Sequence, residues 1–132
     1  MPKLFAAYWG GRAPKCNTEL HDVIFVVGDT IEQTYSQLTQ LWFGSREDLH
    51  IDSWLELSVI DGHAVTLSKT PANTTKKLFF VNLGAYEAQQ FTETHANAFM
   101  VGADVESVKQ RAKSSLLKGM DKIHTDSLFE VD

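Results

Sequence analysis

Two copies of one sequence pattern constrain the fold of this chain more than any other feature. Residues 18–28 read TELHDVIFVVG and residues 92–102 read TETHANAFMVG, so the shared skeleton is T-E-x-H-x-x-x-F-x-V-G. At this offset of 74 residues, 15 of the 55 positions from Lys3 to Leu57 are identical in the two copies, whereas ordinary composition would give about three. The sequence therefore predicts a tandem duplication.

Hydrophobic periodicity predicts the element order β-β-α-β in each copy. The first helix is expected between Thr30, which forms a capping box with Gln33, and Gly44. The second helix is expected to begin after Asp104, a good N-cap residue. Asp61-Gly62 predicts a tight hairpin turn into an extra strand. The predicted strands are residues 3–9, 21–27, 49–59 and 63–67 in the first copy, and 77–83, 97–101 and 123–131 in the second.

These elements predict an α+β fold with a mixed sheet and a helix from each repeat. Repeat 1 is expected over residues 1–67, a linker over 68–76 and repeat 2 over 77–132. Units of this size bury only a marginal core alone. We therefore expect the two repeats to form one compact domain, related by pseudo-twofold symmetry. The two strands that flank each helix are expected to run parallel.

Composition excludes several classes of protein. The net charge of −5 and the scattered basic residues argue against a nucleic-acid-binding surface. The longest apolar runs fall short of a membrane span, and no secretion signal is recognisable. Cys16 is the only cysteine, so an intrachain disulfide is impossible. We expect a cytoplasmic protein.

Polar residues of the first copy are predicted to converge at one end of a sheet. Glu19 and His21 begin one strand, and His50 and Asp52 lie at the start of another, with period-two spacing in each pair. Because the two strands are expected to be parallel, their starts meet. The predicted cluster comprises Glu19, His21, Asp22, His50 and Asp52, with Gly10, Gly11 and Arg12 arriving from the first strand. A reduced version is expected in the second copy from Gly84, Glu93, His95, His124 and Asp126.

Two interpretations of this cluster remain open. Two imidazoles with carboxylates would suit zinc or a similar divalent ion. The alternative is a hydrogen-bond network that holds strand starts together. The recurrence of the Glu, His and Asp residues in both copies favours the second interpretation, since each half would need them to fold. Separately, Gly10, Gly11 and Arg12 form a candidate anion-binding loop.

The first repeat resembles a known family. The string KLFAAYWGGRAPKCNTELHDVIFVVG at residues 3–28, followed by HIDSWLEL at residues 50–57, is similar to the bacterial domain-of-unknown-function family numbered fifteen-forty-three. The second copy departs from the pattern, having Ala85 and Tyr86 where the first has Gly11 and Arg12, and Ala96 where the first has Asp22. The resemblance implies a small bacterial protein with one or two copies of the domain, and it implies no activity.

The function predicted from these observations is that of a small binding or protein-interaction module. A homodimer formed through a free strand edge, or a complex with another protein, is expected. No cofactor is required by this interpretation. The alternative is a divalent-metal-dependent hydrolytic enzyme that uses Glu19, His21, His50 and Asp52 as ligands, with Asp22 or Arg12 assisting.

Overall fold

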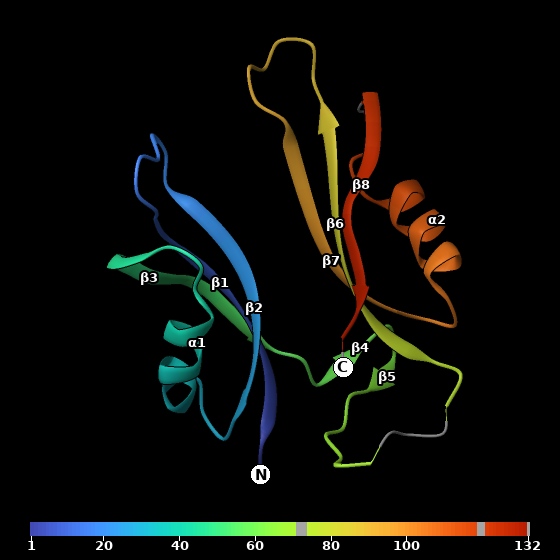
Figure 1. The fold of residues 1–132 in the computed structure, drawn as a ribbon. Coiled ribbons are helices and arrows are strands. Elements are labelled where there is room, and N and C mark those ends of the chain that lie inside the picture. The colour runs from blue at the N-terminus through green and yellow to red at the C-terminus, as the bar shows by residue number, and fades with distance from the viewer. Residues whose placement is uncertain (71–73, 119–120, 132) are drawn as a thin grey trace. The chain divides into compact units, whose positions relative to one another are not determined.

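The computed structural model describes residues 1–70, 74–118 and 121–131, and it divides the chain into two compact units (Figure 1). The first unit comprises residues 1–59 and 64–69, and the second comprises residues 60–63 and 70–132. Residues 71–73 of the predicted linker, and residues 119–120 and 132 of the predicted second repeat, lie outside the described part.

The first unit is a three-stranded sheet with one helix. Its strands are β1 (Lys3–Arg12), β2 (Leu20–Gly28) and β3 (Ser45–Glu56), in the order β2-β1-β3. A 3-10 turn η1 (Glu32–Thr34) and helix α1 (Tyr35–Leu41) connect β2 to β3. Both hydrogen-bonded strand pairs are antiparallel. The parallel relation expected for the strands flanking the helix thus holds between two outer strands that are separated by β1.

The second unit has the same arrangement of elements. Its strands β6 (Lys77–Tyr86), β7 (Thr94–Gly102) and β8 (Asp121–Glu130) have the order β7-β6-β8, again with antiparallel pairs. Helix α2 (Val105–Ser115) begins as expected at Asp104, whose carboxylate accepts a hydrogen bond of 2.8 Å from the Ser107 N–H. The fold is therefore α+β, with a separate antiparallel sheet in each unit. The pseudo-twofold relation between the repeats stays a prediction.

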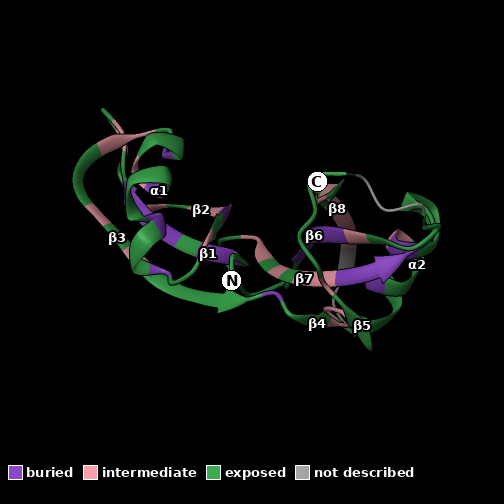
Figure 2. Cartoon of the chain, turned by 90° about the horizontal axis from the view of Figure 1, so that it is seen from below, coloured by how far each residue is buried: buried purple, intermediate pink, exposed green. Residues whose placement is uncertain are grey.

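Each helix covers one face of its own sheet. Alternate residues of β1, namely Phe5, Ala7 and Trp9, pack with Leu38 and Trp42 in the first core. Phe79, Val81 and Leu83 of β6 pack in the same way with Val108 and Ala112 in the second core. Figure 2 shows the buried residues concentrated in these central strands and on the inner sides of the helices. The opposite face of each sheet carries the polar residues that are described below.

Helix α1 differs in its limits from the prediction. The Thr30 hydroxyl accepts from the Gln33 N–H at 3.4 Å, but the Gln33 side chain accepts from the Asp29 N–H at 3.0 Å and not from the Thr30 N–H, so only half of the predicted capping box forms, and α1 itself begins at Tyr35. The helix nevertheless ends at Leu41, three residues before Gly44, because Trp42 adopts an extended conformation and packs into the core. Among the described residues, no helix combines the length and the apolar character that a membrane span requires.

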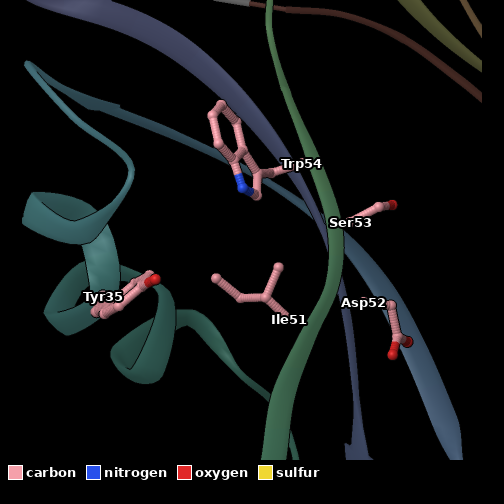
Figure 3. Close-up of a pocket in the computed structure, with 5 residues that line it drawn as sticks. All are labelled: Tyr35, Ile51, Asp52, Ser53 and Trp54. Atoms are coloured by element: carbon pink, nitrogen blue, oxygen red, sulfur yellow. The ribbon is translucent and has the colours of Figure 1, made fainter.

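A β-bulge in β3 changes which residues share a face. Tyr8 pairs with Ser53 and Trp9 with Ile51, so Asp52 is an extra residue on β3. Figure 3 shows the consequence: Ile51 and Trp54 project toward α1, whereas Asp52 and Ser53 both project away from it. Strict alternation along β3 would place Ile51, Leu55 and Leu57 on one face, but alternation fails at the bulge. Trp54, which alternation would have placed outside, contacts Phe5 edge-on at 5.6 Å between ring centroids.

The predicted hairpin turn is present and is anchored within the second unit. Strands β4 (Val59–Ile60) and β5 (His63–Ala64) are joined by Asp61 and Gly62, whose φ angles of 51° and 74° suit a two-residue turn. The extra strand is shorter than the predicted 63–67. Asp61 Oδ2 accepts hydrogen bonds from the Val101 N–H at 2.7 Å and from Arg111 Nη2 at 2.8 Å.

Replacing Asp61 tests this anchor. The Val101 N–H first, and then Arg111, lower the pKa of Asp61 below its usual range. The resulting stabilisation is present above the unfolded pKa of about 3.9 and is lost as the pH falls through the folded value. We expect Asp61→Asn to lower the free energy of unfolding by about 1 kcal/mol at neutral pH, discounted because the side chain is one-third exposed. Urea denaturation should show this difference shrinking at acid pH; a difference that is independent of pH would contradict the account.

Candidate functional site

The strand register brings the predicted histidines together over one glycine. Gly10 of β1 lies opposite His21 of β2 and opposite His50 of β3. Because paired residues of neighbouring strands point to the same face of a sheet, both imidazoles stand on the face of Gly10. This is the face turned away from α1.

Gly10 leaves room for the polar groups that lie above it. A Cβ atom built there would lie 2.7 Å from Glu19 Oε1, 2.7 Å from His50 Nε2 and 2.9 Å from Asp52 Oδ2. These distances are shorter than nonbonded atoms tolerate, so any side chain would push the polar groups apart. Glycine in the middle of a strand costs about 0.5–1 kcal/mol of stability relative to alanine. The polar groups therefore occupy the space that the side chain of a more strand-compatible residue at position 10 would fill.

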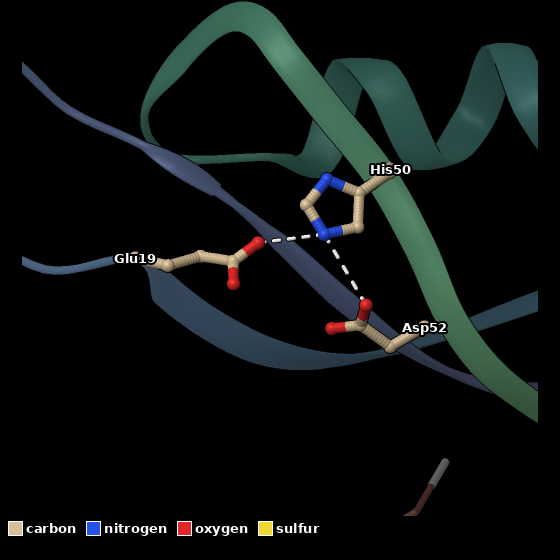
Figure 4. A group of neighbouring side chains, drawn as sticks. All are labelled: Glu19, His50 and Asp52. Carbon is tan, nitrogen blue, oxygen red and sulfur yellow. Dashed lines mark ion pairs between the residues drawn. The ribbon is translucent and has the colours of Figure 1, made fainter.

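Two imidazoles and two carboxylates alternate in a closed ring above Gly10. His50 Nε2 lies 2.6 Å from Glu19 Oε1 and 3.2 Å from Asp52 Oδ1, contacts that Figure 4 marks with dashed lines. His21 Nε2 lies 3.6 Å from Glu19 Oε2 and 3.1 Å from Asp52 Oδ2. Each carboxylate thus faces both histidines. We call Glu19, His21, His50 and Asp52 the first ring.

The backbone fixes the orientation of His50. Its Nδ1 atom lies 2.6 Å from the carbonyl oxygen of Asp48, and a carbonyl can only accept, so Nδ1 carries a proton. In the neutral imidazole the Nε2 atom then presents its lone pair to the ring. Asp48 has a positive φ of 60° and lies in the irregular part of β3 between Ser45 and His50, where the register with β1 shifts. The same arrangement orients metal-binding histidines in many proteins.

The titration of His50 is a direct test of the ring in the metal-free protein. The Asp48 carbonyl first, and then Glu19 and Asp52, raise the pKa of His50 above 6.5. The stabilisation that these partners give the folded state is fully present below the unfolded pKa and is lost as the pH rises through the folded value. We expect an NMR titration to show the raised pKa, and Glu19→Gln to move it downward. A His50 pKa at or below 6.5 in the wild-type protein would contradict the ring geometry.

Tyr8 flanks the first ring and was not predicted as a site residue. Its ring stacks on His21, with 5.0 Å between the centroids and 2° between the planes. Burial, followed by the charges of Asp52 and Glu19, raises the pKa of the Tyr8 phenol. Tyr8 precedes Gly10 by two residues, so period-two spacing could have placed it on this face. The second copy has Asn82 at the corresponding position, so Tyr8 is not among the residues that recur in both copies.

Three of the predicted site residues lie elsewhere. Asp22 follows His21 and pairs with Trp9, a core residue, so it faces the helix side rather than the ring. A Cβ atom on Gly11 would meet the Trp42 side chain at 2.8 Å, so Gly11 also serves packing on that side. Gly10 and Gly11 belong to the paired part of the central strand β1. An anion site would instead need a loop whose backbone N–H groups point toward the anion. Arg12 ends β1 on an exposed position, where it pairs with Ser45.

The second unit contains the same ring in full. Gly84 lies opposite His95 and His124. His124 Nε2 lies 2.6 Å from Glu93 Oε1 and 2.8 Å from Asp126 Oδ1, while His95 Nε2 lies 3.4 Å from Glu93 Oε2 and 2.9 Å from Asp126 Oδ2. Asp126 is the extra residue of a bulge in β8, as Asp52 is in β3. We call Glu93, His95, His124 and Asp126 the second ring; the prediction of a reduced version understated it.

Three donor atoms of each ring lie close enough together to hold one divalent ion, and the second histidine of the ring borders them. Two neutral imidazoles and two carboxylates carry a charge of −2, which one divalent ion neutralises. A mixed nitrogen and oxygen set of four ligands is typical of zinc and related ions, whereas calcium and magnesium prefer oxygen alone. In each ring, three donor atoms from Glu19, His50 and Asp52, or from Glu93, His95 and Asp126, lie within 4.8 Å of one another.

Comparison with known proteins identifies relatives without an assigned activity. The family model described as Domain of Unknown Function (DUF1543) matches residues 16–67 and 90–132. No curated protein matches the chain in sequence. Among solved structures, protein Il1583 from Idiomarina loihiensis is similar, with 32% identity and a TM-score of 0.78. The match covers 100% of this chain and 79% of that one.

Proposed function

Because the chain belongs to the DUF1543 family, which implies no activity, we propose a function from the geometry: the protein binds a divalent transition-metal ion of the zinc class at its first ring. The observation that carries the proposal is the convergence of two imidazole nitrogens and two carboxylates over Gly10. A binding module was the function predicted from the sequence. A divalent metal ion held by the first ring would be the ligand of such a module. The homodimer, the protein partner and the cytoplasmic location stay predictions.

Burial argues that the first ring is not needed for folding. Its four side chains are between 33% and 45% exposed, on the face opposite the apolar core. Exposed ion pairs contribute about 0–1 kcal/mol to stability. The recurrence of these residues in both repeats, which first favoured a structural role, is therefore not explained by a need for them in folding.

Metal analysis tests the proposal. The protein would be purified without an affinity tag, dialysed against zinc chloride and then against buffer, and analysed by inductively coupled plasma mass spectrometry. The variant His21→Ala/His50→Ala is expected to hold one zinc ion fewer per chain than the wild type. Asp22→Asn is the matched control, since this carboxylate faces the other side of the sheet, and it should hold as much zinc as the wild type. Equal zinc content in the wild type and the double variant would refute the proposal.

Hydrolysis is a second candidate function, favoured by the exposure of the ring. An ion held by side chains that are about two-fifths exposed would be open to water and to a substrate. Such an ion would supply Lewis acidity and activate water at neutral pH. Here the chain's own residues would hold and orient the ion, and Tyr8 would border the bound substrate. Hydrolysis of p-nitrophenyl acetate or p-nitrophenyl phosphate that needs zinc and is lost in His21→Ala/His50→Ala would support this candidate. Binding without turnover would leave a binding module.

A further inference from the structure

We infer that the second ring is a second, independent site for a divalent transition-metal ion, and that it binds this ion more tightly than the first ring. The inference rests on the proposed function, because it uses the same ligand chemistry. It goes beyond that proposal in assigning a second site and an order of occupancy to the chain.

The second ring is complete although the residues around it differ between the copies. The second copy has Ala96, Tyr86 and Asn82 where the first has Asp22, Arg12 and Tyr8. None of the three replaced residues is a member of the first ring. The four ligand types, the glycine beneath them and the bulge that presents the aspartate are all retained. The chain has thus kept the ring while the positions around it changed.

The contacts within the second ring are also shorter than those within the first. In the second ring, the longest of the four contacts between an imidazole nitrogen and a carboxylate oxygen is 3.4 Å, against 3.6 Å in the first. The two contacts of the second aspartate are 2.8 and 2.9 Å, against 3.1 and 3.2 Å for Asp52. A Cβ atom on Gly84 would collide with Glu93 Oε1 and would lie 2.6 Å from Asp126 Oδ2. The ligand atoms of a tetrahedral zinc ion lie about 3.3 Å apart, so the imidazole and carboxylate groups of either ring would separate slightly around a bound ion, and the order of affinity follows from burial.

The carboxylates of the second ring are less exposed than those of the first. Glu93 is 22% exposed and Asp126 27%, whereas Glu19 is 40% and Asp52 34% exposed. Glu93 Oε1 is inaccessible to solvent and, within the part of the chain that the structure describes, makes no hydrogen bond of good geometry, although His124 Nε2 lies 2.6 Å away. A carboxylate that has already lost water attracts a cation more strongly, because screening is weaker and less hydration remains to be lost. This difference predicts the higher affinity of the second ring.

A stepwise titration tests both parts of the inference. Zinc chloride would be titrated into metal-free wild-type protein by isothermal titration calorimetry, with Gly84→Ala and Gly10→Ala as matched variants. The colliding atoms at each glycine are the ends of flexible side chains, so each variant should keep its fold, which circular dichroism would verify. We expect two binding events in the wild type. Gly84→Ala should lose the tighter event and keep the weaker one, and Gly10→Ala should do the reverse. Asp126→Asn provides a second variant should Gly84→Ala unfold.

The other outcomes separate this inference from the proposed function. A single event that disappears only in Gly10→Ala would overturn the inference and leave the proposed function standing. A single event that disappears only in Gly84→Ala would support a site at the second ring and overturn the proposal for the first. Two events of which Gly84→Ala loses the weaker would overturn the predicted order of affinity. Absence of binding in the wild type would overturn both proposals.

Discussion

Gly10→Ala is expected to weaken zinc binding at the first ring by at least about 100-fold, although it changes no ligand. The carbon atom of the added methyl group would lie only 2.7 Å from Glu19 Oε1 and 2.7 Å from His50 Nε2. These atoms would have to separate, and a metal site requires its ligand distances to be kept within about 0.2 Å. Substitutions that only disturb ligand orientation cost 10–100-fold in affinity, so direct displacement of several ligands should cost at least the upper value.

The measurement is calorimetric titration of Gly10→Ala and wild-type protein under identical conditions, with the second ring inactivated by Asp126→Asn in both. Alanine suits a strand better than glycine does, so the free energy of unfolding of the metal-free variant should stay within about 1 kcal/mol of the wild type. Unchanged zinc affinity in Gly10→Ala would mean that the ring does not hold the ion.

Substitutions on the two faces of the first sheet are expected to differ strongly in their cost to stability. Leu38→Ala is expected to lower the free energy of unfolding by about 2–5 kcal/mol, because Leu38 is fully buried and its truncation leaves a cavity in the core. Glu19→Ala, on the opposite face, should cost less than about 1 kcal/mol in the metal-free protein, since its contacts are exposed.

Urea denaturation of both variants, in buffer containing a chelator, measures the difference. The chelator matters because bound zinc stabilises the folded state, by about 2.7 kcal/mol at a free concentration of 100 times Kd. Glu19→Ala should lose this additional stabilisation at the first ring when zinc is supplied. If the metal-free Glu19→Ala variant were as destabilised as Leu38→Ala, the ring would be a structural network instead.

The sequence was informative where residues recur or alternate regularly. The period-two spacing of Glu19 with His21 and of His50 with Asp52, together with the parallel strands expected on either side of the helix, was sufficient to predict that these groups meet at one end of a sheet. The helix start at Asp104 followed from capping preferences alone. The match of the DUF1543 model to two segments agrees with the tandem duplication.

Features that depend on strand register and on contacts between distant residues could not be predicted from the sequence. The bulge at Asp52 reverses the alternation of β3, and nothing in the string of residues marks the extra position. Asp22 is adjacent to His21 in sequence but faces the other side of the strand, so proximity in sequence was misleading. The role of Gly10 depends on three side chains from two other segments, and the tautomer of His50 depends on a backbone carbonyl. Such contacts arise only from register and turn geometry.

The most direct test of the account is anomalous X-ray diffraction from crystals of the wild-type protein grown with zinc chloride. The account predicts an anomalous peak at the zinc absorption edge within each ring, at about 2.0–2.2 Å from the histidine Nε2 atoms and from carboxylate oxygens of the same ring. Crystals whose rings show no anomalous peak, with Glu19 still within hydrogen-bonding distance of His50, would contradict it.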